Sequence, residues 1–133
     1  MWRWTVGLTL AVAAASCAPG DTASRAPMAQ GRLYTAWLYG SQFDKLWDRF
    51  SPEMRQTFGS VSELASFAGH AVSRLGPEHG VVDERVERAS PFQVYSRTAS
   101  FDTSRRPMLI EWSLARDGAV TGLVVRPVPD EQP

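Results

Sequence analysis

The stretch Met108-Leu109-Ile110-Glu111-Trp112-Ser113-Leu114 decides the fold class of this 133-residue chain. Every second residue is large and apolar, and successive side chains of a strand point to opposite faces of a sheet. This alternation therefore predicts a strand with one face against a core and Glu111 on the opposite face. Asp117-Gly118 follows, a pair typical of a tight hairpin turn. It predicts a hairpin between this strand and the apolar run over residues 120–126.

Two more strands are predicted upstream of this hairpin. Residues 81–88 alternate valine with charged residues, which indicates a strand with one polar face, and Ser90-Pro91 breaks it. A longer strand is expected from Phe92 to Phe101, where Tyr95, Arg97 and Ala99 share a face. Residues 102–107 form the next turn. The second half of the chain thus predicts an antiparallel meander of four strands.

The first half has the period of helices. Apolar residues recur at helical spacing up to Gly40, a stop signal, and Ser41 is expected to cap a second helix. Ser51-Pro52-Glu53 predicts a third helix, because a capping hydroxyl precedes a proline at the first helical position. The apolar residues expected to face inward from these helices are Leu33, Tyr34, Trp37, Leu38, Phe43, Leu46, Trp47, Phe50, Met54 and Phe58.

A fourth and longer helix is predicted after Gly59. Ser60-Val61-Ser62-Glu63 resembles a capping box, and Gly76-Pro77 ends the helix. Its expected inward residues are Leu64, Phe67, Ala68, Ala71, Val72 and Leu75. Helices followed by an antiparallel meander predict an α+β domain, with the N-terminal helices packed on a curved sheet.

The bulk composition excludes several classes of function. Fourteen basic and fourteen acidic residues cancel, so no net field attracts nucleic acid. Gly-rich phosphate loops, His/Cys metal-ligand spacings and the Gly-x-Ser-x-Gly and Ser-x-x-Lys motifs of serine hydrolases are absent from the sequence. We therefore expect no cofactor and no metal. The Arg105-Arg106 pair is too small a basic patch for nucleic-acid binding.

The N-terminus has the composition of an export signal. A short head containing Arg3 precedes the apolar run Val6 to Ala15, which is too short to span a membrane as a helix. The only cysteine, Cys17, follows in Ala14-Ala15-Ser16-Cys17, which resembles the cleavage box of a bacterial lipoprotein signal. That resemblance implies lipid attachment at Cys17 and a membrane-anchored protein of the bacterial envelope. The alternative is ordinary cleavage after Ala15, which would leave a soluble periplasmic or secreted protein.

These boundaries divide the chain into four segments. Residues 1–16 are the predicted signal peptide, and 17–29 are the predicted lipid-attachment cysteine and a flexible tether rich in small and polar residues. Residues 30–127 form the α+β domain, and residues 128–133 are expected to be a disordered tail.

The domain resembles a family. Residues 33–44, 50–55 and 119–127 are similar to the opening helices, the following turn and the last strand of nuclear-transport-factor-like domains, also called ketosteroid-isomerase-like cones. The resemblance covers about residues 30 to 127. It implies a cone-shaped domain of an uncharacterised secreted branch, members of which often stand beside serine hydrolases of the penicillin-binding type. It also leaves open a homodimer through the convex face of the sheet.

A cone of this type leaves a pocket at its wide end, and ligands favour concave apolar places. The residues expected to line it are Trp37, Phe43, Trp47, Phe67, Tyr95, Arg97 and Trp112. These aromatic residues suit a small apolar ligand. The alternative is that they simply fill the core. Arg97 would need a carboxylate partner or an anionic ligand if its face of the strand is the concave one, because a buried unpaired charge is costly.

Enzymes of the family use a buried carboxylate as a general base, sometimes with a histidine. The catalytic candidates here are only Asp44, in the first turn of a helix, and His70, on the long helix. Neither is paired with a recognisable base. We therefore expect a non-catalytic binding or accessory module of the cell envelope, whose partner is a hydrolase or a small apolar ligand. The alternative is a small isomerase or dehydratase acting on a hydrophobic ligand.

Overall fold

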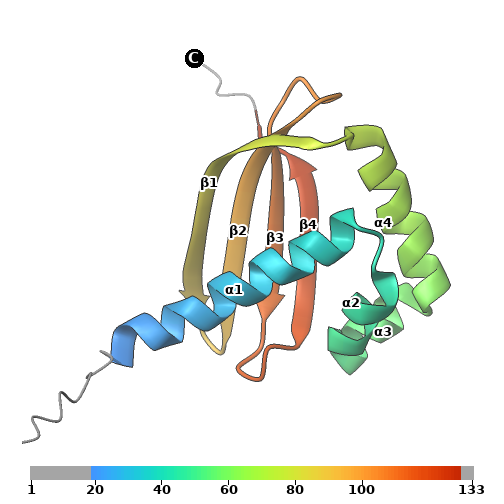
Figure 1. Cartoon of the computed structure of the whole chain (residues 1–133). Helices are drawn as coiled ribbons and strands as arrows, with labels where there is room; N and C mark the ends of the chain where they lie inside the picture. The colour runs from blue at the N-terminus through green and yellow to red at the C-terminus, as the bar shows by residue number, and fades with distance from the viewer. Residues whose placement is uncertain (1–18, 130–133) are drawn as a thin grey trace, which may run out of the picture.

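The computed structural model describes residues 19–129 and contains helices followed by strands (Figure 1). The helices are α1 (Pro19–Tyr39), α2 (Phe43–Arg49), α3 (Pro52–Phe58) and α4 (Val61–Leu75). The strands are β1 (Glu78–Ala89), β2 (Phe92–Phe101), β3 (Met108–Leu114) and β4 (Val120–Pro127). The predicted α+β class is confirmed.

The strands form one antiparallel sheet in the order β1-β2-β3-β4. Tyr95 of β2 lies opposite Trp112 of β3, and Trp112 lies opposite Leu123 of β4. Because paired residues share a face, these side chains stand together on the side covered by helices. Glu111 lies on the other face, as its alternation with Trp112 predicts.

The helices cover one face of the sheet and one edge of it. Helix α1 crosses the sheet, whereas α2, α3 and α4 lie beyond the β4 edge (Figure 1). The chain between α2 and α3 is fixed to that edge, since Phe50 forms a parallel bridge with Val120 and the Ser51 N–H donates to the Val120 carbonyl at 2.9 Å. The sequence predicts that Phe50 belongs to the second helix. In the structure Phe50 instead follows α2 as its C-cap residue.

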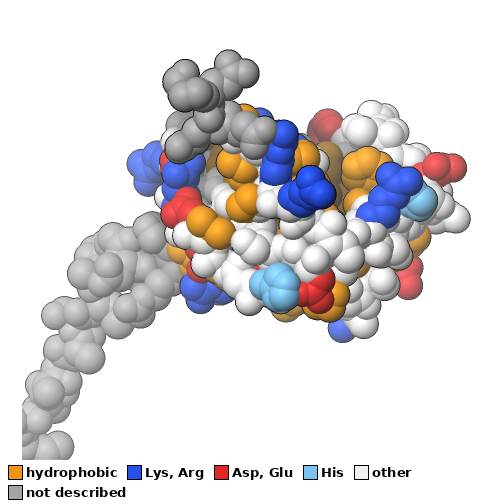
Figure 2. Space-filling model, turned by 90° about the horizontal axis from the view of Figure 1, so that it is seen from above, with side chains coloured by type: hydrophobic (Ala, Val, Ile, Leu, Met, Phe, Trp, Pro, Cys, Tyr) orange, Lys and Arg blue, Asp and Glu red, His pale blue; other side chains and the backbone are white. Residues whose placement is uncertain are grey.

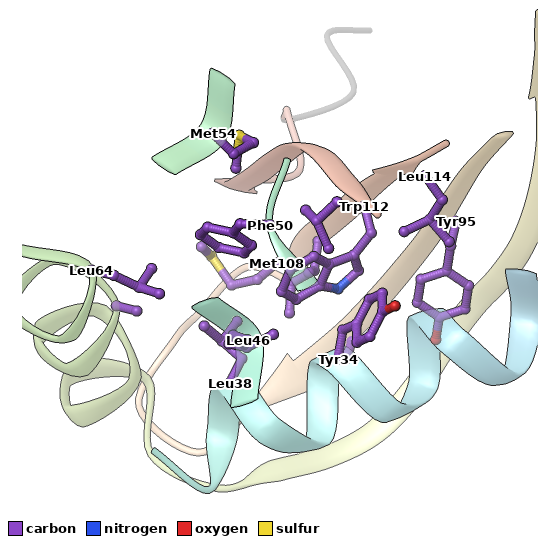
Figure 3. Close-up of a cluster of buried hydrophobic side chains, with 14 of the residues drawn as sticks. Tyr34, Leu38, Leu46, Phe50, Met54, Leu64, Tyr95, Met108, Trp112 and Leu114 are labelled. Carbon is purple, nitrogen blue, oxygen red and sulfur yellow. The ribbon is translucent and has the colours of Figure 1, made fainter. Parts of the chain in front are cut away.

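The core lies between the helices and the sheet (Figure 3). Its largest fully buried side chains are Tyr34, Leu46, Leu64, Tyr95, Ile110, Trp112, Leu114 and Val120. Two buried hydrogen bonds tie α1 to the sheet: the Trp112 indole donates to Thr35 Oγ1 at 2.9 Å, and the Tyr34 hydroxyl donates to the Gly118 carbonyl at 2.7 Å. Each buried polar group at this contact thus has a partner, which removes the cost of its desolvation.

Gly31 lets α1 approach the sheet closely. A Cβ atom at this position would lie 2.1 Å from Cγ of Tyr95, well inside van der Waals contact. Tyr95 is fully buried, so its ring has no free space into which to move. The distance between α1 and β2 therefore depends on the absence of a side chain at residue 31.

The helix caps follow the sequence in two cases and differ in one. The hydroxyls of Ser51 and Ser60 accept hydrogen bonds from the N–H groups of Met54 and Glu63, as the sequence predicts. Ser41 does not cap α2. It has a φ of 57°, and Gln42 takes the N-cap position without a side-chain bond.

Helix α1 covers residues 19–29 of the segment 17–29 in which the sequence predicts a flexible tether. It begins at Pro19 and contains Pro27 in its interior. A proline there removes one helical hydrogen bond, which is why the sequence favoured a loop. Tertiary packing outweighs that cost, because Pro27 is buried and Met28 packs against the core. In the predicted tail, the Val128 N–H donates to the Pro107 carbonyl at 2.9 Å, while residues 130–133 lie outside the described part of the chain.

Candidate functional site

A cluster of charged and phenolic side chains joins α1 to the first two strands. Arg97 Nη1 donates to Glu84 Oε2 at 2.8 Å, and the Tyr95 hydroxyl donates to the same oxygen at 2.6 Å. From α1, Arg32 Nε donates to Glu84 Oε1 at 3.0 Å. Arg97 also forms an ion pair with Glu78. We call these residues, Arg32, Glu78, Glu84, Tyr95 and Arg97, the polar cluster.

The register of β1 and β2 brings the polar cluster together. Glu84 lies directly opposite Arg97, on the face of the sheet that α1 covers. The side chain of Arg97 is 18% exposed and those of Glu78 and Glu84 are 15% and 14% exposed. Arg97 thus lies on the face covered by α1 and has the carboxylate partners that a largely buried charge requires. The sequence did not identify these partners, although Glu84 is one of the charged residues in the predicted polar strand.

The cluster shifts the acidities of its members. Hydrogen bonds from Arg32, together with that from Tyr95, lower the pKa of Glu84 from 4.5 to about 2 despite its partial burial. Burial and the hydrogen bond to Glu84 raise the pKa of Tyr95 to about 12. The hydrogen bond to Glu78 raises the pKa of Arg97 above its usual range. At neutral pH Glu84 therefore remains ionised and paired with Arg32 and Arg97, and these contacts hold α1 against the sheet.

This arrangement predicts a loss of stability in acid. A carboxyl whose pKa is lower in the folded state stabilises the fold above its unfolded pKa, and the contribution disappears as pH falls. For Glu84 the loss should occur between about pH 4.5 and pH 2. Glu84→Gln lacks the stabilisation that ionised Glu84 provides. The difference in unfolding free energy between wild type and this variant should therefore shrink as the pH falls from 4.5 to 2. Urea unfolding at a series of pH values measures it, and a constant difference between pH 5 and pH 2 would contradict the prediction.

The second candidate site is an open groove between α4 and strands β3 and β4, which we call the α4 groove. Its volume is about 670 Å³. It is lined by Glu63, Ser66, Phe67, His70, Ala71, Arg74, Leu75, Met108 and Val125. Seen from above, the α4 side of the molecule shows hydrophobic surface beside basic and histidine side chains (Figure 2). The groove thus combines an apolar floor with polar groups at its margins.

Phe67 is the large aromatic residue of the α4 groove. Its side chain is 57% exposed, although the spacing of apolar residues on α4 predicts an inward position. One edge of its ring meets Phe58 of α3, with ring centroids 5.6 Å apart. Leu64 and Ala68 on the same helix are buried. The core therefore covers only part of the apolar face of α4. Phe67 lies outside the covered part and faces the α4 groove.

The other predicted pocket residues do not share one cavity, which corrects that expectation. Tyr95 and Trp112 are fully buried and fill the core. Trp37, Phe43 and Trp47 are half-buried around the helical side of the core. The Trp37 ring packs on Tyr34 with centroids 5.6 Å apart, and Trp47 packs on Phe50 at 6.1 Å. Aromatic rings take these places because burying their large area stabilises a small domain.

The catalytic candidates Asp44 and His70 are both exposed. Asp44 is exposed in the first turn of α2, where a carboxylate favours the helix dipole. His70 is exposed at the margin of the α4 groove. Neither side chain makes a hydrogen bond or ion pair within residues 19–129. The isomerase hypothesis relied on one of these groups being buried beside the ligand, and the structure gives neither that environment.

Cys17, the predicted lipidation site, lies outside the described residues. Within the described range, no helix is long and apolar enough to cross a membrane. The same residues contain no group of three or more His, Cys, Asp or Glu side chains able to hold a metal ion.

Comparison with known protein families, with curated proteins and with solved structures gave no match. The functional argument therefore rests on the α4 groove, the polar cluster and the N-terminal sequence.

Proposed function

We propose that this protein is an exported, lipid-anchored binding module of the bacterial envelope that holds a small apolar ligand in the α4 groove. The exposure of Phe67 carries this proposal. A phenyl ring 57% exposed on a helix that is otherwise packed leaves apolar area in water. Covering the exposed part of that ring with a ligand would gain about 1–2 kcal/mol, a little over half of the usual value for burying a whole large apolar side chain.

The size and chemistry of the groove support a ligand of this class. Sites for small molecules usually have volumes of about 300–1,000 Å³ and a predominantly apolar lining, and the α4 groove has about 670 Å³. Arg74 lies at its margin, and its guanidinium makes no ion pair within the part of the chain that the structure describes. An amphiphile with an apolar body and one anionic group would satisfy both features.

The proposal includes the finer fold assignment and the anchor. Four helices followed by a four-stranded antiparallel sheet support a nuclear-transport-factor-like cone, the family that the sequence resembles. The apolar run before Cys17 supports export and lipid attachment. The module would then deliver its ligand to a neighbouring envelope protein such as a hydrolase, or bind that protein directly. The isomerase alternative gains no support, because the buried carboxylate of Glu84 is held as an ion pair by Arg32 and Arg97.

Ligand binding in the groove predicts that Phe67→Asp weakens the affinity for an anilinonaphthalene sulfonate dye by about tenfold, since the lost apolar contact is worth about 1.4 kcal/mol or more. Fluorescence titration measures the affinity. Val82→Asp is the matched control, because Val82 is 63% exposed and lies on β1, away from the groove. Equal dye affinity in Phe67→Asp and Val82→Asp would remove the groove from the proposal.

Lipid anchoring predicts a change of location in Cys17→Ala. Without the thiol, no acyl group can attach, and the chain should move from the membrane fraction to the soluble exported fraction. Fractionation of cells that produce the full chain, followed by mass spectrometry of the N-terminal peptide, measures both location and modification. A variant that remains in the membrane would show that Cys17 is not the anchor.

A further inference from the structure

The end of the domain at which α1 begins is the end closest to the proposed lipid. One residue, Ala18, separates Cys17 from Pro19, the first residue of α1. Covalent geometry therefore keeps the Cα atoms of Cys17 and Pro19 within about 8 Å of each other. From Pro19 the helix rises about 10 Å to Ala26. An acylated Cys17 thus holds the first contacts of α1 with the sheet close to the bilayer.

These first contacts surround a shallow hollow at one end of the sheet. It has a volume of about 460 Å³ and lies between α1, the turn joining β1 to β2 and the turn joining β3 to β4. Both turns lie at the end of the sheet from which the N-terminal half of α1 projects (Figure 1). The lining of the hollow includes Ala26 from α1, Arg88, Ser90 and Phe92 at the first turn, and Arg116 at the second.

The hollow carries positive charge that the protein does not neutralise. Arg88 and Arg116 are exposed and form no ion pair within residues 19–129. Arg85, by contrast, is paired with Asp83 and Glu87 on the outer face of the sheet. The other nearby acid, Asp117, accepts a hydrogen bond from the Ala119 N–H in its own turn. The lining of the hollow therefore contains two guanidinium groups and no carboxylate.

An exposed aromatic ring lies beside these arginines. Phe92 follows Pro91 at the start of β2 and is 39% exposed. Aromatic and basic residues together are typical of surfaces that lie in the headgroup region of a membrane, where the ring contacts acyl chains and the cations contact phosphates. Each arginine near an anionic bilayer contributes about 1 kcal/mol.

We propose that Arg88, Phe92 and Arg116 form a docking surface for anionic phospholipid, against which the anchored domain lies. The proposal depends on lipid attachment at Cys17. Phe92 enters the interfacial layer, and the two arginines bind lipid phosphates. Because the helix begins only two residues after Cys17, the domain does not turn freely above the membrane. The α4 groove lies on the side of the molecule away from the start of α1 and stays open to the periplasm (Figure 1).

Site-directed spin labelling tests this surface, because the chain has one cysteine and lipidation consumes its thiol. Ser90→Cys places a nitroxide in the β1–β2 turn, and Arg105→Cys places one in the β2–β3 turn at the opposite end of the sheet. The lipidated chains are reconstituted in phosphatidylethanolamine vesicles containing phosphatidylglycerol. Accessibility to oxygen and to an aqueous nickel complex then reports the depth of each label.

We expect the label at residue 90 to be protected from nickel and the label at residue 105 to be accessible. Adding Arg88→Gln and Arg116→Gln should raise nickel access at residue 90 several-fold, and Arg126→Gln, in β4 near the far end, should not. Equal access at residues 90 and 105 would overturn the docking surface. Equal protection in purely phosphatidylcholine vesicles would overturn its dependence on anionic lipid.

Failure of the anchor gives a different result. If the wild-type chain, without an introduced cysteine, takes up the spin label at Cys17, its thiol is free. That outcome overturns lipid attachment, and the docking surface with it. A blocked Cys17 with an exposed label at residue 90 overturns the docking surface alone.

Discussion

Gly31→Ala is expected to destabilise the protein by about 3 kcal/mol, a large effect for the addition of one methyl group to a helix. The new Cβ would lie 2.1, 2.3 and 2.6 Å from three ring atoms of Tyr95. The Tyr95 hydroxyl is fixed by Glu84 at 2.6 Å, so the ring cannot swing aside without breaking the polar cluster. Helix α1 must then move away from the sheet, which opens the core. Urea unfolding followed by tryptophan fluorescence measures the loss.

Gly69→Ala is the matched control for this change. Gly69 lies within α4, and a Cβ there would meet the Phe43 ring at 3.8 Å, an ordinary contact. Alanine favours a helix by about 1 kcal/mol over glycine, so this variant should be slightly more stable than wild type. If both variants were stabilised, the close approach of α1 to β2 would be wrong.

Arg97→Met is expected to destabilise the protein by about 3 kcal/mol at neutral pH, the cost of breaking a largely buried ion pair. Glu78 loses its hydrogen-bonded partner, and Glu84 keeps only Arg32 and the Tyr95 hydroxyl. Methionine preserves much of the side-chain volume, so most of the loss reports charge. Thermal and urea unfolding at pH 7 measure it.

Two variants distinguish the loss of the buried ion pairs of Arg97 from the effect of removing any arginine. Arg85→Met removes a guanidinium that is 59% exposed and paired with Asp83 and Glu87, so it should cost less than about 1 kcal/mol. Arg97→Met combined with Glu78→Gln removes an unpaired carboxylate and should recover part of the stability. Equal losses in Arg85→Met and Arg97→Met would show that burial of the polar cluster contributes nothing.

The sequence predicted the elements whose signals are local. The alternation of Met108, Ile110, Trp112 and Leu114 gave the correct buried face of β3, because each of them is buried and their neighbours are not. The hydroxyls of Ser51 and Ser60 cap helices for the same reason, since a cap involves residues three apart in the chain. The prediction that Ser41 caps the second helix was wrong, because the left-handed backbone of Ser41 depends on how α1 and α2 meet.

Features that depend on contacts distant in sequence were not predicted. Gly31 and Tyr95 are 64 positions apart, and no local pattern indicates that a helix and a strand meet there. The helical start at Pro19 has the composition of a linker, and packing of Pro27 and Met28 against the sheet decides it. Tertiary packing of this kind overrides local propensity.

The candidate site shows the same division. Arg97 was recognised as a charge in need of a partner, but pairing it with Glu84 required the register of β1 against β2. Phe67 was expected to face a cavity, and it lines the α4 groove. Tyr95 and Trp112 were grouped with it, although they fill the core. Alternation assigns a residue to a face of a strand. It does not indicate whether that face meets a cavity or another side chain.

The most direct test of the account is a map of ligand contacts on the folded domain. Amide chemical shifts are recorded while dodecanoate, an apolar chain with one carboxylate, is added to the isotopically labelled protein. The account predicts saturable shifts confined to α4 and to the parts of β3 and β4 near Met108 and Val125, with Phe67→Asp removing them. Shifts centred on the polar cluster, or no saturable shifts, would contradict the claim that the α4 groove is the binding site.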